Sequence, residues 1–546
     1  MMESEPRSIT TTDWLLIGVL VLLVLPLRLW LLHNTEVTAR DSIGYIRYAL
    51  QFERTPWPKV LKDNDQHPGY PALVWLMSVP VRAIDGETTP DNMELSAQLV
   101  NLLASLLLIL PMYFLGRQFF DRPVSFWGTL LYQYLPVSAQ HLSDGISEPM
   151  YLVLLVSGLL QGVRAVRERQ VWRCGLCGGL AGVAYLIRPE GAVILPAFVG
   201  VLIAVQFRSE WRSSWPRFLA CVGTALLAAM LIGSIYVSAT GRITNKISAI
   251  EIIKNLWDLV SGHFLTSESQ GAANGSMVLF GVSFPVTDHR GIRLLRSVWA
   301  LIAEVTQGFH YIAGISAVLG FCGSFGMLRR QPAFWVLLVF SLVHSLLLIA
   351  LAMSVSYVSD RHVMILVLGG CFFVIVGLRE VPRRVLAWLK IDENVDANPG
   401  VGKAWYRSSV VWFGVLLAAL FVICLPKSTQ RLHGNRVGNH AAGLWLAENF
   451  KEGDLIIDDH SWSHFFSGAV FREGIEPALS RDQRPNCYIV TTRSRDSQID
   501  EKRQAGVLEK DAEIVWPGPA ERENARVVVR LQRRNFEKYP WRKLPE

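Results

Sequence analysis

The sequence predicts an all-α membrane domain with many transmembrane helices, followed by a small α/β domain outside the membrane. Charged residues make up only 18% of the 546, whereas soluble proteins carry about 25%. Apolar runs recur from residue 14 to about residue 430, and several reach the about 20 residues that a span needs. Beyond residue 430 short apolar runs alternate with polar turns, a pattern typical of strands. The net charge of +7 is concentrated in short loops, so a nucleic-acid partner is not expected.

The first span follows a polar segment, residues 1–13, which we expect to be a cytoplasmic tail. No small-residue cleavage site follows the apolar run Trp14–Leu32, so this run is an uncleaved span rather than a signal peptide. At about 20 residues a span, we expect about eleven spans in a domain of residues 14–430. They lie near 14–32, 96–115, 123–141, 150–165, 172–187, 190–206, 217–239, 309–328, 332–353, 362–378 and 408–425.

The loops between these runs alternate between arginine-rich and arginine-poor, as the positive-inside rule requires. We therefore place the arginine-rich loops in the cytoplasm and loops 33–95 and 240–308 on the outer face. With an odd number of spans, the domain of residues 431–546 is outside as well. The arginine-rich set consists of Arg117, Arg122, Arg164, Arg167, Arg169, Arg173, Arg208, Arg212, Arg217, Arg329, Arg330, Arg379, Arg383, Arg384 and Lys390.

The first outer loop is much longer than the about 2–8 residues of a simple helix connection. As a helix, residues 39–53 place Asp41, Tyr45 and Tyr48 on one face and three aliphatic residues on another. We expect this helix to lie in the membrane interface, with its aliphatic face in lipid and Asp41 at the surface. Alternatively, Asp41 only stabilises the start of a helix through the helix dipole. The proline-broken segment His67–Ile84 is expected to lie on or dip into the outer surface, a true span being the alternative.

In the C-terminal part, the residue pattern predicts a short helix over 441–450 and strands over 454–458, 487–492, 512–516 and 525–531. A solvated turn around Asp458, Asp459, His460 and His464 is preferred over a metal site. The seven cysteines imply no disulfide framework, because all but Cys487 lie in or beside apolar runs. Helix packing through small residues explains the Cys174–Cys177 pair better than redox or metal chemistry does.

Several short motifs together resemble a known family. Asp41-Ser42, Tyr45 and Ala49 precede His67-Pro68-Gly69-Tyr70-Pro71, and later come Ser143–Pro149, Gly182–Gly191 and Ser359–His362. Their order and spacing over about residues 10–380 resemble GT-C glycosyltransferases, in particular the branch with bacterial aminoarabinose transferases, protein O-mannosyltransferases and RgtA/B/C/D-like enzymes. The chain departs from the family pattern at Ser42, often Glu, and at Gly69, often Pro.

The resemblance implies a role for Asp41 as the general base that takes the proton of the acceptor hydroxyl. It also implies that Asp144 or Glu148 orients the acceptor or assists Asp41, although Glu148 alternatively only caps a helix. Tyr45 and His67 belong to the same outer-loop motifs and are expected to contact substrate. The leaving group would be a polyprenyl phosphate, which departs as an anion and needs positive charge rather than a general acid.

Two arginines, Arg188 and Arg361, lie at the outer ends of spans, where the positive-inside rule predicts few cations. Because guanidinium groups bind phosphate through two hydrogen bonds, both are candidate donor-phosphate ligands. Interfacial snorkelling is the alternative for each. His362 and Lys246 are supporting candidates for the same role.

The function predicted is transfer of a sugar from a polyprenyl-phosphate donor to a lipid, glycan or protein acceptor, with inversion. By the resemblance we expect a bacterial inner membrane with a periplasmic active site. The need for a divalent metal stays open, as do the sugar and the acceptor. The alternatives are a transporter or flippase of glycolipids and a glycan receptor. We favour the enzyme because unusual charges gather at one face rather than along the spans.

Overall fold

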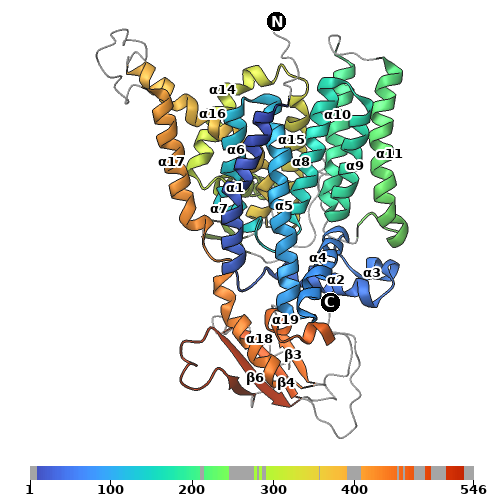
Figure 1. Cartoon of the computed structure of the whole chain (residues 1–546), viewed down its shortest axis with the longest axis vertical. Coiled ribbons are helices and arrows are strands. Elements are labelled where there is room, and N and C mark those ends of the chain that lie inside the picture. The colour runs from blue at the N-terminus through green and yellow to red at the C-terminus, as the bar shows by residue number, and fades with distance from the viewer. Residues whose placement is uncertain are drawn as a thin grey trace.

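A computed structural model shows a long helical bundle with a small mixed sheet near the C-terminus (Figure 1). One end of the bundle carries α2 (Arg40–Arg54), α3 (Trp57–Asp63), α4 (Gly69–Asp85) and the C-terminal sheet, and we call it the site end. The opposite end, near Arg117 and Arg122, is called the basic end. The structure describes residues 9–208, 214–244, 276–279, 282–285, 290–355, 357–389, 408–451, 454–458, 461–472, 486–492 and 512–533.

Within these residues, 8 helical segments are long and apolar enough to cross a membrane. A ninth span is possible if α13 (Arg290–Gly308) and α14 (Ile312–Leu328), bent by 104°, count as one. The 8 segments are α1 (Thr11–Asn34), α5 (Pro90–Phe119), α8 (Glu148–Glu168), η1 (Pro189–Val193) with α10 (Ile194–Gln206), α11 (Trp215–Thr240), α15 (Phe334–Val355), η3 (Asp360–Val363) with α16 (Met364–Trp388), and α17 (Ser409–Ser428).

Three of the about eleven expected spans are not among these 8. The run 309–328 forms α14, which counts as a span only together with α13, and the other two take a different form. The run 123–141 is broken into α6 (Arg122–Tyr134) and α7 (Pro136–His141). The break follows from Pro136, which disfavours helical backbone at the preceding Leu135 (ψ 133°). The run 172–187 forms α9 (Val171–Ile187), whose 17 residues are short for a span. Both still lie within the bundle (Figure 1).

Small residues allow the helices to approach closely, as expected for packing in a membrane. A Cβ on Gly178 of α9 would clash with the carbonyl oxygen of Ala225 in α11. Likewise, a Cβ on Gly320 of α14 would clash with the carbonyl oxygen of Phe373 in α16. Cys174 and Cys177 are buried and unbridged in α9, which agrees with the packing interpretation.

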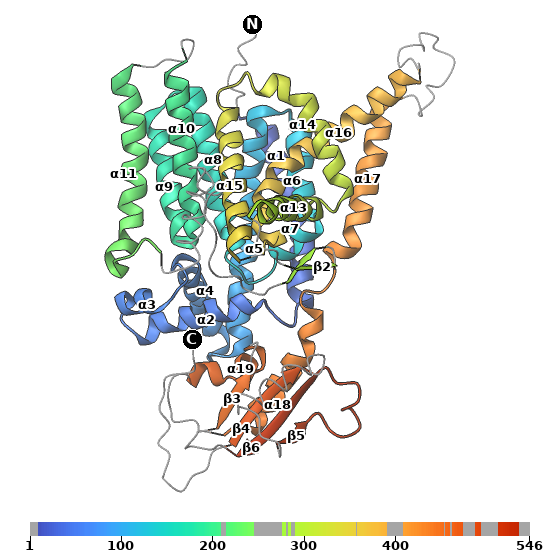
Figure 2. The same ribbon diagram turned by 180° about the vertical axis from the view of Figure 1, so that it is seen from behind.

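The expectation that the aliphatic face of α2 lies in lipid is wrong. Ile43, Ile46 and Leu50 are 1%, 0% and 5% exposed. The reason is that α4 and α5 pack against α2, and Tyr70 of α4 makes an edge contact with Tyr45 (centroids 4.8 Å apart). Helix α4 lies at the site end, between the bundle and the sheet (Figure 2), and is not among the candidate spans.

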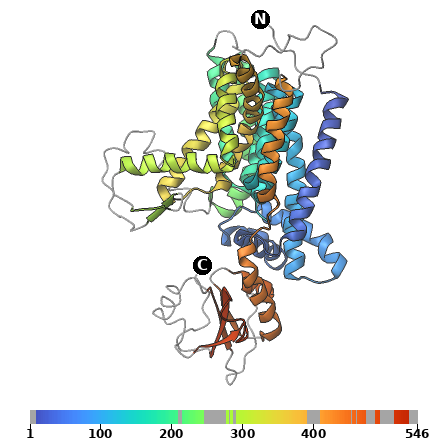
Figure 3. The same cartoon turned by 90° about the vertical axis from the view of Figure 1, so that its left-hand side faces the viewer.

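Helix α13 differs from the other long helices in direction. Figure 3 shows it as the yellow-green helix that runs sideways from the bundle. Its side chains Leu295, Trp299 and Ile302 are 50–71% exposed, and the helix contacts η3. The expected outer loop 240–308 therefore contains a long helix, preceded by an antiparallel hairpin of β1 (Ser276–Leu279) and β2 (Val282–Pro285).

The C-terminal strands fall where the sequence predicts them. They form one sheet in the order β3-β4-β6-β5, in which β3 and β4 are parallel and the other pairs antiparallel. Ala442 and Leu446 of α18 pack on the buried face of this sheet. The elements are η5 (Gly434–Arg436), α18 (Val437–Asn449), β3 (Leu455–Asp458), α19 (Trp462–Phe466), η6 (Ala469–Arg472), β4 (Asn486–Thr492), β5 (Glu513–Trp516) and β6 (Val527–Arg533).

Candidate functional site

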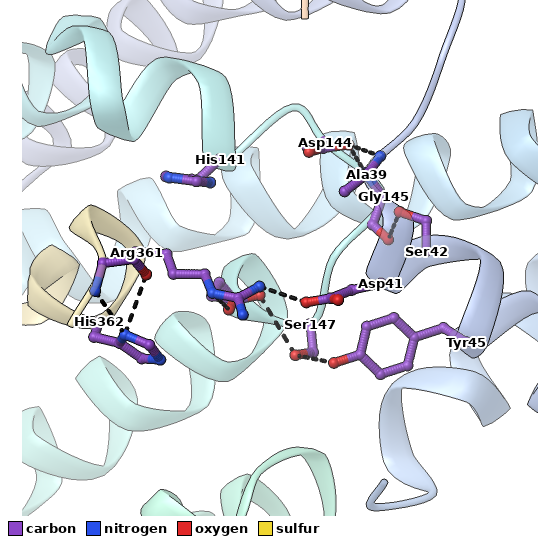
Figure 4. Close-up of polar contacts among 12 residues, drawn as sticks. Ala39, Asp41, Ser42, Tyr45, His141, Asp144, Gly145, Ser147, Arg361 and His362 are labelled. Carbon is purple, nitrogen blue, oxygen red and sulfur yellow. Dashed lines mark hydrogen bonds and ion pairs between the residues drawn. The ribbon is translucent and has the colours of Figure 1, made fainter. Parts of the chain in front are cut away.

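The centre of the candidate site is an ion pair between Asp41 of α2 and Arg361 of η3. The guanidinium NH1 donates to Asp41 Oδ2 over 2.5 Å (Figure 4). The two side chains are 42% and 32% exposed, respectively. A carboxylate and a cation that the sequence separates by 320 positions therefore meet at the site end, where both remain accessible.

A second ion pair joins Glu148, the first residue of α8, to Arg188 at the end of α9. The Nε of Arg361 lies 3.9 Å from the same Glu148 carboxylate. Glu148 thus lies between the two arginines, with its side chain only 6% exposed. Its carboxylate pairs with cations, although its place in the first turn of α8 also suits the start of a helix.

The loop between α7 and α8 is bonded directly to the start of α2. Ser42 Oγ donates to the Gly145 carbonyl over 2.6 Å, and the Tyr45 hydroxyl lies 2.9 Å from Ser147 Oγ (Figure 4). Burial raises the pKa of Tyr45 well above its usual value, so its phenol stays neutral. Tyr45 therefore joins α2 to the turn that precedes Glu148. Substrate contact by Tyr45 stays a prediction.

Asp144 is buried and holds the start of α2. Its Oδ1 accepts from the backbone N–H groups of Ala39 (2.9 Å) and Gly145 (3.0 Å). Its Oδ2 lies 2.8 Å from Nε2 of His433, which follows α17. Burial alone would raise the pKa of Asp144, but His433 and the backbone N–H of Ala39 bring it below its usual value. These contacts favour a positioning role for Asp144, and its assistance in catalysis stays a prediction.

The remaining candidates lie around this cluster. His362 follows Arg361, and its Nδ1 lies 3.2 Å from the backbone nitrogen of Ser359. His67 is 2% exposed and stacks on Tyr236 of α11 (centroids 4.5 Å apart), which packs the turn before α4 against α11. Its contact with substrate, like phosphate binding by His362, stays a prediction. Lys246 lies outside the described residues.

Sequence reasoning missed four polar residues that the fold brings to the cluster. Ser147 contacts Tyr45, Asp360 lies 3.1 Å from Nε2 of His141, and His433 contacts Asp144. Asp360 and Ser147 belong to the recognised motifs, so their neighbourhood was a usable signal. Nothing in the sequence around His433 pairs it with a residue 289 positions away.

The carboxylates at the site are already paired with cations. In the described part of the chain, no group of three or more His, Cys, Asp or Glu side chains is arranged to hold a metal ion. In the tail, Asp458 accepts the backbone N–H of Ser463 over 2.7 Å, as expected for a polar turn. Asp459 and His460 lie outside the described residues.

Comparison with known proteins supports the fold assignment. The model of the dolichyl-phosphate-mannose-protein mannosyltransferase family matches residues 67–233. The apo oligosaccharyltransferase of Archaeoglobus fulgidus is 14% identical, with a TM-score of 0.52 over 88% of this chain and 70% of that one. ArnT from Cupriavidus metallidurans bound to undecaprenyl phosphate is also 14% identical, with a TM-score of 0.51 over 96% and 98% of the two chains. No curated protein matches in sequence.

The similarity to ArnT extends over nearly the whole length of both chains, from the helical bundle to the sheet after the last span. The family match covers α4 to α11. The chain therefore shares its overall fold with these two membrane proteins, and residues 67–233 are similar to the mannosyltransferase family model.

Proposed function

We propose that the chain transfers a sugar from a polyprenyl-phosphate donor to a hydroxyl group of a lipid, glycan or protein, at the periplasmic face of a bacterial inner membrane. The observation that carries the proposal is the contact between the Asp41 carboxylate and the Arg361 guanidinium at the site end. It joins a group able to accept a proton to a group able to bind phosphate. The undecaprenyl phosphate bound in ArnT and the acceptor peptide tethered to the A. fulgidus enzyme support the two substrate classes.

Asp41 is assigned the role of general base. Its carboxylate accepts the proton of the acceptor hydroxyl as that oxygen forms a bond to the anomeric carbon. The bond from the anomeric carbon to the phosphate oxygen breaks, and its electron pair stays on the phosphate. The products are an inverted glycoside, a protonated Asp41 and polyprenyl phosphate. No general acid is needed, because the leaving phosphate is stable as an anion.

Arg361 is assigned the role of binding the donor phosphate, together with Arg188. Without substrate, the Arg361 guanidinium donates to Asp41 Oδ2 over 2.5 Å, so this carboxylate oxygen is occupied. A donor phosphate competes for the same guanidinium and offers it two oxygens. Donor binding would therefore release Asp41 for the acceptor and place the positive charge where the leaving group develops negative charge.

The proposal is tested first in cells by mass spectrometry of membrane glycolipids and glycoproteins with and without the gene. A glycan that disappears with the gene and returns with the wild-type chain, but not with Asp41→Asn, supports the enzyme. If Asp41→Asn restores the glycan as well as wild type does, Asp41 is not the base. A flippase would instead leave the sugar on its lipid carrier, so the purified chain would convert no donor to polyprenyl phosphate.

Stereochemistry and sidedness are tested separately. Nuclear magnetic resonance of the product should show the anomeric configuration opposite to that of the donor, and retention would exclude direct displacement. A tag placed within residues 54–66 should be reached by a reagent that does not cross the membrane. If the tag is reached only from the cytosol, the periplasmic placement is wrong.

A further inference from the structure

We propose that the segment after α17 is a structural part of the active site, in which His433 and Trp462 are positioning residues that fix the start of α2 and thereby Asp41. The proposal rests on the proposed function for its catalytic consequence only. The contacts themselves lie in two elements, the turn before η5 and helix α19, that belong to the C-terminal domain rather than to the bundle.

His433 makes the first contact. Its Nε2 lies 2.8 Å from Asp144 Oδ2, and the carboxylate is only 7% exposed. The other oxygen of Asp144 accepts the backbone N–H of Ala39, the residue immediately before α2. His433 itself has left-handed backbone (φ 47°), which non-glycine residues rarely adopt. One buried carboxylate thus links this unusual turn to the helix that carries Asp41 two residues later.

Trp462 makes the second contact, with the residue that precedes Ala39. Its indole N–H donates to the carbonyl of Thr38 over 2.9 Å, and the ring is 5% exposed. Arg436 of η5 lies over the ring, 4.8 Å from its centroid, which holds the indole in place. The carbonyl of residue 38 and the N–H of residue 39 belong to one peptide group. Trp462 holds this peptide directly at its carbonyl, and His433 holds it indirectly at its N–H, through Asp144.

A peptide held at both polar atoms has little freedom to rotate. Asp41 follows it within the first turn of α2, where a change in the entry angle would move the carboxylate relative to Arg361. Displacements of about 1 Å from near-attack geometry can lower rates by about 100-fold. The C-terminal domain therefore contributes to catalysis through the placement of Asp41, without itself contacting the reacting atoms.

The same segment offers a matched contact that lacks this connection. Arg431 pairs with Glu36 over 3.0 Å, but the two side chains are 61% and 42% exposed. The pair also joins the C-terminal segment to the first loop, yet it touches neither Asp144 nor the peptide between Thr38 and Ala39. Arg431→Ala is therefore a control for removal of a contact between the same two parts of the chain.

The experiment uses the full chain in nanodiscs of phosphatidylethanolamine and phosphatidylglycerol. Hydrogen exchange is measured for peptides covering residues 38–45 in wild type, His433→Ala, His433→Lys, Trp462→Phe and Arg431→Ala. We expect exchange of the first α2 amides to rise about tenfold in His433→Ala, the factor for one lost charge-assisted hydrogen bond. Trp462→Phe should show a smaller rise, whereas His433→Lys, which keeps a cation, should approach wild type. Arg431→Ala should not differ from wild type.

Transfer from an undecaprenyl-phosphate sugar provides the second measurement. We expect kcat of His433→Ala to fall about tenfold with the donor KM within about twofold, because the arginines are carried by η3 and α9 rather than by α2. Exchange equal to that of Arg431→Ala would overturn the proposal, and so would faster exchange with unchanged kcat. If His433→Ala does not fold, the proposal is tested with Trp462→Phe, which removes only one N–H. If wild type transfers nothing, the proposed function fails while the exchange data still judge the positioning.

Discussion

Two carboxylates paired with arginine occupy opposite ends of the bundle and differ in what else they contact. At the basic end, Asp13 is only 2% exposed in its side chain. Both of its oxygens accept several hydrogen bonds, from Thr10, Tyr113, Arg117 and Arg122. At the site end, the side chain of Asp41 is 42% exposed and forms an ion pair with Arg361.

The difference teaches how to separate a structural acid from a reactive one. A carboxylate has about four lone-pair sites, and those of Asp13 are occupied by groups that exclude water. Its contacts fix the start of α1 to α5 and α6. Asp41 keeps an open side toward solvent and a partner that phosphate can replace. Acceptor capacity left over in the folded chain, rather than charge alone, marks the candidate base.

The largest expected effect separates these two acids directly. Asp41→Asn should lower the transfer rate at least about 100-fold, the contribution of a general base, and leave the thermal midpoint unchanged. Asp13→Asn should instead lower the free energy of unfolding by about 1.5–3 kcal/mol, because the buried side chain loses its charge-assisted hydrogen bonds with Arg117 and Arg122, while folded molecules keep their rate. The measurements are transfer rate per folded molecule and thermal unfolding in nanodiscs. If Asp13→Asn lost more of the transfer rate than Asp41→Asn, the assignment of Asp13 as the structural acid and Asp41 as the reactive one would be wrong.

A second test compares two arginines. Arg361→Gln should raise the donor KM about 10–100-fold, the value of a hydrogen bond to a charged group. Arg379→Gln removes an ion pair with Asp121 of similar length (2.7 Å) at the basic end, with side chains 41% and 43% exposed. Because such surface pairs contribute about 0–1 kcal/mol, we expect no change in donor KM there. Binding of undecaprenyl phosphate, measured by calorimetry, should follow the same order. If Arg361→Gln and Arg379→Gln changed the donor KM equally, the assignment of Arg361 to the donor site would be wrong.

The third test uses pH. Burial would lower the pKa of His433, and so would the nearby positive charges of His141 and Arg436. The carboxylate of Asp144 outweighs them and raises the pKa above the usual 6.5. The contribution of the pair is therefore full below about pH 6.5 and is lost as the pH rises through the raised pKa. We expect the transfer rate to fall on the alkaline side by up to about tenfold, and His433→Lys to move that fall to higher pH. An alkaline limb that is identical in the two proteins would exclude His433 as its cause.

The smallest expected effect concerns two glycines. A Cβ on Gly145 would lie 2.9 Å from Thr38 Oγ1 and 3.0 Å from Ser42 Oγ. Gly145→Ala should therefore cost about 1 kcal/mol through overpacking and lower the rate by no more than about fivefold. A Cβ on Gly18 of α1 would meet no atom within 4 Å, so Gly18→Ala should cost nothing. Thermal unfolding and transfer rate of both variants provide the check.

Much of the fold could be predicted because its signals are local. Apolar runs predict the helices of the bundle, and short alternating runs predict β3 to β6 close to their true bounds. Proline at position 136 is also visible in the sequence, but the run 123–141 is largely apolar on both sides of it and so resembles a single span. The lipid-facing assignment of α2 failed for a different reason. Periodicity identifies an apolar face but not what covers it, and here α4 covers it.

The candidate site was predictable in its residue types rather than in its pairings. Arg188 and Arg361 are cations at the ends of spans where the positive-inside rule predicts few, and Asp41 is an acid in a long loop. Which of them touch was not predictable, since Asp41 and Arg361 are 320 positions apart. The position of Glu148 between the two arginines and the contact of His433 with Asp144 depend on tertiary structure in the same way. The chemical roles of all these residues stay predictions.

The direction of α13 has a consequence for where lipid substrates meet the protein. Because α13 is bent by 104° from α14, a membrane crossed by α14 would contain α13 parallel to its plane. The exposed Leu295, Trp299 and Ile302 then contact acyl chains near the headgroups. Since α13 packs on η3, the depth of Arg361 is set by this horizontal helix. Under the proposed function, the phosphate of a membrane-anchored donor would meet the Arg361 guanidinium at that depth while its isoprenoid tail remains in the bilayer.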